Sequence, residues 1–273
     1  CSASPPEKLI TVAILDTETT GLDQNKDKLI ELGIVLVEID PVTGQAYRVL
    51  KVFNELEDPG MPIPEESTRI HNITNEMVSG RKINNSEVEF LMTDASLVVA
   101  HNASFDRPFV ERRFPIFKDK HWACSFRQIP WDEEGIGSAK LEYLAYKFGF
   151  YFTGHRASND CHALLEILQE SLPTSGAKAM QVLLQAARTP AIKVAALGSP
   201  FESKDALKDR GYRWHPDKRI WATIISKKDL DEEVTWLKNS VYSGKGFRLE
   251  QEIVTSKNRF SSRVGDIQIV KYD

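Results

Sequence analysis

The stretch LITVAILDTETTGL, residues 9–22, decides the fold of this chain. Its first part, LITVAILD, is a near-continuous apolar run, which is typical of a strand that is buried on both faces of a sheet. Two further strand patterns follow, LIELGIVLVEI at 29–39 and AYRVLKVFNEL at 46–56, and the turns between them are rich in Gly, Asp, Asn and Pro. The sequence therefore predicts that residues 9–55 form a three-stranded β-meander.

Helices and short strands alternate after this meander. A helix is expected around 86–92, a strand at 97–100, a helix from Ser104, a strand around 122–126 and a helix over 140–148. Ser104 is expected to cap its helix, with Pro108 in the first turn, where proline is tolerated. A last helix should begin near Ser158 and stop at Pro173. Together these elements predict a mixed α/β sheet flanked by helices over residues 9–172.

A second, smaller unit is expected near the C-terminus. The segment 173–191, bounded by Pro173 and Pro190, is predicted to be a linker that contains one short helix. Residues 192–244 follow the order strand, helix, strand, strand, helix, with PDKR as a hairpin turn, and this order predicts a small α+β domain. The remaining residues, 245–273, are polar and poorly patterned, and we predict no fold for them.

The composition fits a soluble globular protein, with 273 residues, 41% hydrophobic and 27% charged. No run of 18 apolar residues occurs, so no membrane span or membrane partner is expected. The three cysteines, Cys1, Cys124 and Cys161, have no CxxC spacing. This argues against a disulfide framework and against a zinc site, and it favours a reducing, cytoplasmic location.

Charge is distributed unevenly along the chain. Residues 1–189 carry 19 Lys and Arg against 27 Asp and Glu, whereas residues 190–273 carry 16 against 12. The acidic first part is compatible with a carboxylate-rich metal site, and the mildly basic end could contact phosphates. A balance of +4 is also ordinary surface variation, so charge alone decides neither point.

Four carboxylates and one histidine stand where they can meet. Asp16 and Glu18 lie two positions apart at the end of the first strand, so they project from one face and form half of a divalent-metal cradle. A lone DxE is most simply a solvated strand end. Asp106, however, follows another buried strand at the start of a helix, and His155 and Asp160 stand five residues apart before and inside the last helix.

Convergence of these residues would demand bound cations, because four clustered carboxylates cannot stay ionised and unpaired without a large cost. Hard oxygen ligands select Mg²⁺, or Mn²⁺ in its place, over zinc. Two such ions would suit in-line attack on a phosphodiester, and a histidine could take the proton of the attacking water.

Three motifs resemble those of the DEDDh exonuclease family, which includes the proofreading epsilon subunit of bacterial DNA polymerase III and RNase T. They are DTETTGL at 16–22, HNASFD at 101–106 and HRASND at 155–160, in the family's order and at similar intervals. IHNIT at 70–74 resembles a further family segment, with Asn72 in place of a glycine. The resemblance implies a ribonuclease-H-like sheet and stepwise release of nucleoside 5′-monophosphates from a 3′ end.

The resemblance also implies roles for individual residues. The metal ligands would be Asp16, Glu18, Asp106 and Asp160, and His155 would be the general base. Thr19 would contact the terminal nucleotide near its 3′-hydroxyl, and Leu22 would wedge against a base. The remaining expected groove residues each have a structural alternative: His71 can cap a turn, Asn102 can orient Asp106 together with His101, and Phe105 can belong to the core.

The function expected from this reading is 3′→5′ exonuclease activity on nucleic acid with a free 3′ end, with DNA favoured over RNA and a role in DNA replication or repair. The alternative is a catalytically idle relative that binds nucleic acid or protein. In the C-terminal domain, Trp214 and Trp221 on a basic hairpin could stack bases, form the domain core, or belong to a module that docks a protein partner. The oligomeric state is left open.

Overall fold

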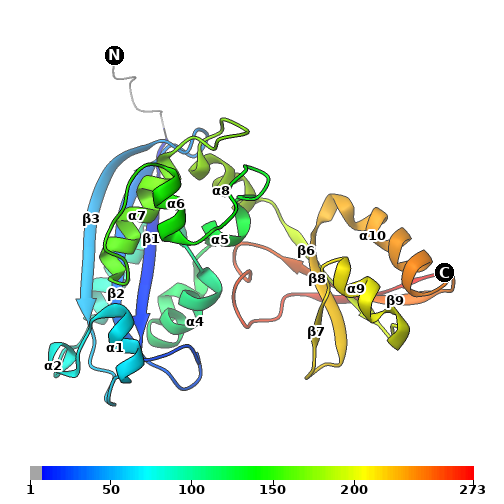
Figure 1. Ribbon diagram of the computed structural model, residues 1–273, viewed down its shortest axis with the longest axis horizontal. Helices are drawn as coiled ribbons and strands as arrows, with labels where there is room; N and C mark the ends of the chain where they lie inside the picture. Colours follow the sequence, from blue (N-terminus) through cyan, green and yellow to red (C-terminus); the bar gives the residue numbers. More distant parts are fainter. Residues whose placement is uncertain (1–7) are drawn as a thin grey trace. The chain divides into compact units, whose positions relative to one another are not determined.

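The structure is a computed structural model that describes residues 8–273 and divides between Ala187 and Arg188 into two compact units (Figure 1). Cys1 lies outside the described residues, and the other two cysteines, Cys124 and Cys161, are free and buried. Within residues 8–273, no helix combines the length and apolar character that a membrane crossing requires.

The first unit is built on the mixed sheet that the sequence predicts. β1 (Ile10–Thr19), β2 (Leu29–Ile39) and β3 (Ala46–Leu56) form the antiparallel meander. β4 (Leu97–Ala100) and β5 (Trp122–Cys124) add to the other side of β1 in parallel, so the strand order is β3-β2-β1-β4-β5. The prediction of a mixed sheet in a ribonuclease-H-like arrangement is confirmed.

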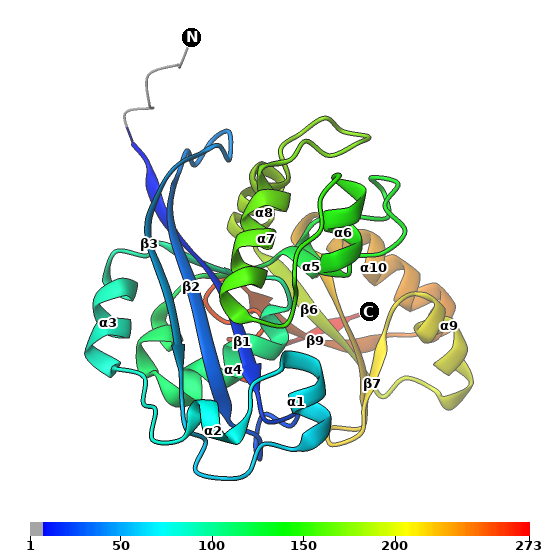
Figure 2. The ribbon, with the colours of Figure 1, turned by 60° about the vertical axis from the view of Figure 1, so that its left-hand side comes forward.

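Helices cover both faces of this sheet. α7 crosses one face, and α3 and α4 lie behind the other (Figure 2). The helices of the unit, in chain order, are α1 (Glu65–His71), α2 (Asn75–Val78), α3 (Asn85–Thr93), α4 (Ala103–Arg113), α5 (Ser125–Gln128), α6 (Leu141–Lys147), α7 (Ala157–Gln169) and α8 (Ala179–Arg188), with a 3₁₀ turn, η1, at Pro115–Asp119.

A close approach between α7 and the sheet places the N-terminus of that helix. Val12 and Ile14 on β1 belong to the same buried cluster as Leu164 and Leu168 on α7. At the end of the sheet, a Cβ added to Gly33 would lie 2.5 Å from the backbone carbonyl carbon of Ala157. Glycine therefore lets the first turn of α7 rest directly on β2.

The start of α4 differs from the prediction. Asn102, not Ser104, occupies the N-cap position, and its side chain makes no capping hydrogen bond. The helix begins earlier because the chain turns directly after β4, so Pro108 lies inside the helix beyond its first turn. Proline cannot donate to the carbonyl of Ser104, four residues before it. Ser104 is exposed, where water can reach that carbonyl.

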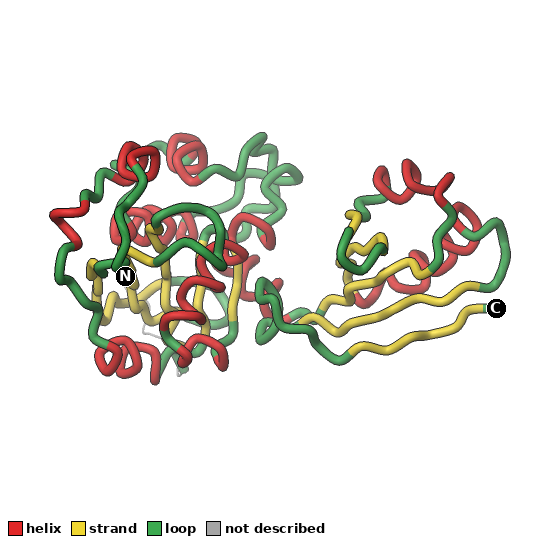
Figure 3. The backbone as a smooth tube through the Cα atoms, turned by 90° about the horizontal axis from the view of Figure 1, so that it is seen from below, coloured by secondary structure: helices red, strands yellow, loops and turns green. Residues whose placement is uncertain are grey.

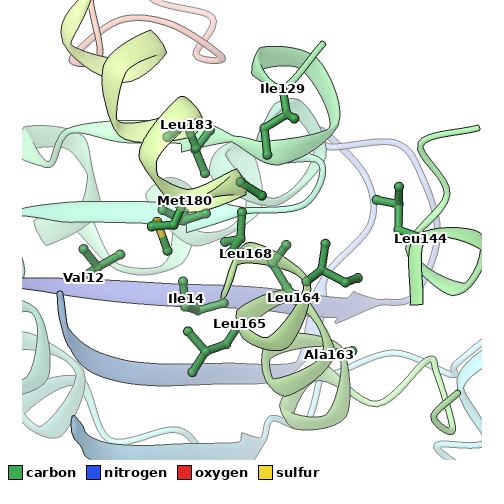
Figure 4. Packing of buried hydrophobic residues seen from close by; sticks show 14 of the residues in the cluster. Val12, Ile14, Ile129, Leu144, Ala163, Leu164, Leu165, Leu168, Met180 and Leu183 are labelled. Carbon is green, nitrogen blue, oxygen red and sulfur yellow. The ribbon is translucent and has the colours of Figure 1, made fainter. Parts of the chain in front are cut away.

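The segment 173–191 differs from the predicted linker, because most of it packs on the first unit. α8 buries Met180 and Leu183 in the same cluster as Val12, Ile14 and Leu168 (Figure 4). The proline at each end of this segment suggested a linker, but the apolar residues at helical spacing needed a partner to cover them. The boundary between the units therefore lies at the end of α8.

The second unit contains the predicted elements and two strands that were not predicted. β6 (Ala191–Leu197), α9 (Lys204–Asp209), β7 (Arg213–His215), β8 (Ile220–Ser226) and α10 (Leu230–Trp236) follow in the expected order. Short helical turns, η2 (Phe201–Ser203) and η3 (Lys227–Asp229), precede α9 and α10, and η4 (Leu237–Val241) follows α10.

The expectation that 245–273 has no fold is wrong. This segment forms β9 (Phe247–Val254) and β10 (Ile267–Tyr272), and the C-terminal strand lies at the edge of the sheet (Figure 3). The strand order is β10-β9-β6-β8-β7. On β9 the buried Phe247 and Leu249 alternate with the polar Arg248 and Glu250, and β10 is an edge strand with no buried residue. The polar residues on β9 and the exposure of β10 explain why neither strand showed a long apolar run.

Candidate active site

Three carboxylates meet where β1 ends against α7. Asp16 and Glu18 project from the face of β1 that α7 covers, because they continue the alternation of Val12 and Ile14. Asp160 lies in the first turn of α7. One oxygen from each of the three carboxylates lies within 4.8 Å of the other two. These residues, which the sequence predicts as ligands, are therefore together in the fold.

Asp106 approaches this cluster from the α4 side of the sheet. Its Oδ1 accepts a 2.8 Å hydrogen bond from Oγ1 of Thr17, whose side chain points to the opposite face from Asp16 and Glu18. Asp106 is not part of the 4.8 Å group, but it lies close enough for its charge to raise the pKa of Asp16. Sequence reasoning missed the role of Thr17, although strand alternation alone directs it toward α4.

Burial and mutual repulsion raise the pKa of every carboxyl in this cluster. The pKa of Asp16 is well above its ordinary value, because of burial and then the charges of Asp106 and Asp160. Burial raises the pKa of Glu18 to about 8, that of Asp106 to about 7 and that of Asp160 to about 6, with like charges adding to the effect. A divalent cation would relieve this repulsion.

His155 stands at the mouth of the cluster on the turn that precedes α7. Its backbone is left-handed, with φ of 61°, and its side chain is 52% exposed. Its Nε2 lies 3.7 Å from Oε1 of Glu142, which belongs to α6. Because this imidazole is exposed, it can accept a proton from a molecule that enters the cleft from solvent.

An ion pair between the partly exposed Arg156 and the buried Glu31 fixes the turn that carries His155, and it was not predicted from the sequence. Arg156 donates from Nη2 to Oε1 of Glu31 at 2.8 Å and from Nε to both carboxylate oxygens at 3.1 and 3.2 Å. The Glu31 side chain is 0% exposed and also accepts from the backbone N–H of Ala157. The N–H of Arg156 donates to Oδ2 of Asp160 at 3.0 Å. An Arg beside the predicted His155 was the available signal.

The cluster forms the floor of a cleft of about 400 Å³. Predicted site residues and several that were not predicted line it: Asp16, Thr17, Glu18, Leu22, His101, Asn102, Phe105, Asp106, Phe126, Lys140, Leu141, Glu142, His155 and Asp160. Lys140 is the lysine among these lining residues, and it was not predicted because a lone Lys at a helix start carries no motif.

The two residues expected at the terminal nucleotide differ in exposure. Leu22 is 86% exposed and lines the cleft. Thr19 is 6% exposed, and its Oγ1 donates a 2.6 Å hydrogen bond to the carbonyl of Gly21. The hydroxyl of Thr19 therefore shapes the turn after β1.

Phe105, Asn102 and His101 all line the cleft, and His101 also has a structural role. The ring of Phe105 contacts Phe109 with a centroid distance of 5.1 Å, so Phe105 combines a packing contact with a place at the cleft. His101 hydrogen bonds Oγ of Ser125 at 2.8 Å and the carbonyl of Ala139 at 2.7 Å. These bonds do not involve Asp106, so Thr17 holds that carboxylate instead.

His71 lies beneath the surface rather than in the cleft lining. It is 2% exposed, and its Nδ1 accepts a 3.0 Å hydrogen bond from the N–H of Ile73. Asn72 between them adopts the left-handed conformation, with φ of 57°. The geometry favours the turn-capping interpretation of His71.

Comparison with known proteins identifies the family of the first unit. A family model described as "Exonuclease" matches residues 13–168. The DNA polymerase III subunit epsilon of Aquifex aeolicus is 30% identical over 164 residues, which cover 58% of this chain and 78% of that protein. A PolC-type DNA polymerase III of Thermotoga maritima is 28% identical over 172 residues, and the match covers 58% of this chain but only 11% of that protein. The chain thus spans about a tenth of its PolC-type relatives.

Two solved structures also match part of this chain. Exonuclease X in complex with 5′-overhanging duplex DNA is 28% identical, with a TM-score of 0.47, and the match covers 64% of this chain and 99% of that one. The nuclease domain of 3′hExo, a DEDDh family member bound to rAMP, is 16% identical, with a TM-score of 0.47, and the match covers 62% of this chain and 96% of that one.

Proposed function

The chain belongs to the exonuclease family whose model matches residues 13–168, and from this premise we propose that it is a DEDDh-type 3′→5′ exonuclease. The substrate is nucleic acid with a free 3′ end, and the products are nucleoside 5′-monophosphates. The observation that carries the proposal is the convergence of Asp16, Glu18 and Asp160 within 4.8 Å of one another on the floor of a cleft.

The donor set fits divalent metal. Its atoms are carboxylate oxygens, which magnesium and manganese prefer, and their raised pKa values reflect a repulsion that a cation would remove. Asp16, Glu18, Asp106 and Asp160 would hold two Mg²⁺ ions, with Mn²⁺ as a substitute. When bound, such ions lower the pKa of a coordinated water and neutralise the charge on the leaving oxygen.

His155 would act as the general base. It is exposed at the mouth of the cleft, and from there its imidazole can take the proton of the attacking water. Glu142, 3.7 Å from its Nε2, would stabilise the protonated ring by charge. The Arg156–Glu31 pair holds the adjoining backbone, so it positions His155 and Asp160 relative to β1.

The rest of the cleft would bind the terminal nucleotides. The exposed Leu22 is placed to press against a base, and Phe105 and Asn102 line the same cleft. Thr19 would act through its backbone, because its hydroxyl is already bonded to Gly21. The DNA polymerase III names of the relatives support DNA over RNA as substrate, and a role in replication or repair.

The decisive test is a degradation assay with Mg²⁺ on single-stranded DNA labelled at either end, with duplex DNA and RNA alongside. A 3′ label should be released at once as a mononucleotide, whereas a 5′ label should pass through a ladder of shortening strands. Release of a 5′ label first would overturn the polarity. Binding without degradation, in Mg²⁺ or Mn²⁺, would identify an idle relative.

A further inference from the structure

The second unit has one sheet face that its helices leave open. The chain order β6-α9-β7-β8-α10-β9 with the strand order β9-β6-β8-β7 is the split β-α-β arrangement, and β10 extends it at one edge. Ile192 and Val194 on β6 and Leu249 on β9 share a buried cluster with Leu207 of α9 and Leu237 after α10. Both helices therefore cover the same face.

Strand register identifies the side chains on the opposite face, which we call the open face. Lys193 on β6 pairs with Glu252 on β9, and their side chains lie 3.7 Å apart. From this pair, alternation places cations, acids and aliphatic residues on the open face. The cations outnumber the acids: the cations are Lys193, Arg213, Arg248 and Lys271, the acids are Glu250 and Glu252, and the aliphatic residues include Ile224 and Ile269. Ile224 is 56% exposed and Ile269 60% exposed, and Arg213, Arg248 and Lys271 are exposed as well.

Charge in this unit is segregated between its two sides. The helical segments, 199–210 and 227–242, carry six Lys and Arg against seven Asp and Glu. The strands and their loops, 191–198, 211–226 and 243–273, carry ten against five. Of those five acids, Glu252 pairs with Lys193, and Asp273 pairs with Lys271 at 2.9 Å. The net positive charge of the unit therefore belongs to its strands and their loops and not to its helical segments.

This surface suits a phosphate backbone rather than stacked bases. Trp214 and Trp221 form a cross-strand pair, and Trp221 packs on the helix-covered cluster, so both rings lie on the other face. Among the strands of residues 191–272, the residues assigned to the open face are charged, polar or aliphatic. Cations spaced over a sheet face can contact successive phosphates without reading sequence.

We propose that the open face binds the phosphate backbone of a single nucleic-acid strand, at a segment of the substrate away from the 3′ end that is cut. The inference rests on the proposed function only in naming this strand as the substrate. The polyanion is the occupant because the face is cationic while the opposite side of the same unit is not.

The experiment measures binding of a fluorescent 20-nucleotide oligothymidine to the full chain in EDTA, across a series of NaCl concentrations. One variant combines Arg213→Ala, Arg248→Ala and Lys271→Ala. The matched control combines Lys208→Ala, Lys227→Ala and Lys228→Ala, which removes the same charge from exposed helix-side positions. A third variant, with Arg213→Lys, Arg248→Lys and Lys271→Arg, keeps the charge.

The open-face variant should bind on the order of ten- to a hundredfold more weakly, and its slope of log affinity against log salt should fall by about two, since each single-strand phosphate contact contributes about 0.7. The control and the charge-conserving variant should match the wild type. The proposal would be overturned if the open-face and control variants had equal slopes of log affinity against log salt. It would also be overturned if oligothymidine affinity depended only on the net charge of the variant and not on which cations were removed. Because EDTA prevents cleavage, a protein that never degrades DNA could still pass this test.

Discussion

The two units of this chain handle charge in opposite ways. In the first, like charges converge: Asp16, Glu18 and Asp160 lie within 4.8 Å of one another. Thr17 donates a hydrogen bond to the nearby Asp106, and the backbone N–H of Arg156 donates one to Asp160. In the second, cations such as Arg213 and Arg248 stand apart on an exposed sheet face. The clustered carboxylates repel one another, and a bound metal ion can relieve this repulsion. The separated cations instead spread positive charge over a wide surface that a ligand can contact. The first arrangement suits chemistry and the second suits binding.

The largest effect should come from removing a convergent carboxylate. Asp16→Ala should lower turnover by on the order of 10⁴-fold, the size seen when one member of a catalytic set is lost. The fold should persist, because the substitution removes repulsion and no core volume. Steady-state cleavage with Mg²⁺ and a circular dichroism spectrum would measure both. Glu166→Ala, an exposed change on α7, is the control. An Asp16→Ala protein that keeps more than about a tenth of the rate would end the metal-site assignment.

The next largest loss of activity should come from removing His155, the proposed general base beside this cluster. His155→Ala should slow cleavage by about 10²- to 10⁴-fold, the usual contribution of a general base. The wild-type rate should rise with pH through the neutral range, and the variant should lose that limb. His162→Ala, at an exposed position on α7, should leave the profile unchanged. A variant with the wild-type pH profile would remove His155 from the mechanism.

Motifs explain why so much of the first unit could be predicted. Asp16, Glu18, Asp106, His155 and Asp160 stand in short patterns beside strands and helix starts, so local sequence locates them. Thr17 and the pair of Glu31 and Arg156 could not be found in this way, because their roles depend on partners far along the chain. Glu31 lies 125 residues from Arg156 in sequence.

The second unit shows the limit of reading apolar patterns. β9 has polar residues between its buried ones and β10 is an edge strand with no buried residue, so both strands look polar. The packing of α8 against β1 could not be predicted from the sequence either. The prolines near its ends indicate a boundary, but the sequence does not show which element covers the apolar side of this helix. The hairpin with Trp214 and Trp221 was predicted correctly, but which face its rings occupy depends on the register of β6, β8 and β9.

A smaller effect should follow from breaking the ion pair beneath the site. Arg156→Ala should lower the free energy of unfolding by about 2–4 kcal/mol, because it leaves the buried Glu31 carboxylate without its main partner. Chemical denaturation would measure this loss. Adding Glu31→Gln to Arg156→Ala should restore part of the stability, since the neutral side chain needs no cation. A double variant as unstable as the single one would contradict the pairing argument.

The convergent acids should also make the metal-free protein less stable at higher pH. The folded-state pKa values of about 6 for Asp160, 7 for Asp106 and 8 for Glu18 exceed the ordinary values of 3.8 to 4.5. The folded state therefore binds more protons than the unfolded state, and the stability present at low pH is lost as pH rises through these values.

Thermal unfolding in EDTA at pH 5.5 and 8.5 would measure this loss, and saturating Mg²⁺ should reduce it. Asp16→Asn combined with Glu18→Gln is the matched variant, because it removes two charges from the cluster at little change in shape. Its melting temperature should depend less on pH than that of the wild type. An equal dependence in the two proteins would place the effect elsewhere.

The smallest effect should come from Trp214, and it separates the two faces of the second unit. Trp214 is 47% exposed, with its ring 5.6 Å from that of Trp221, on the face that the helices cover. Trp214→Ala should lower the free energy of unfolding by about 0.5–1.5 kcal/mol, as an aromatic pair is lost. It should leave oligothymidine affinity and its salt slope as in the wild type, because the phosphate-binding cations lie on the other face. If the hairpin instead stacks bases, binding should weaken by about 1–3 kcal/mol per base with an unchanged slope. Comparing Trp214→Ala with the open-face variant in one titration therefore shows which face of this sheet meets nucleic acid.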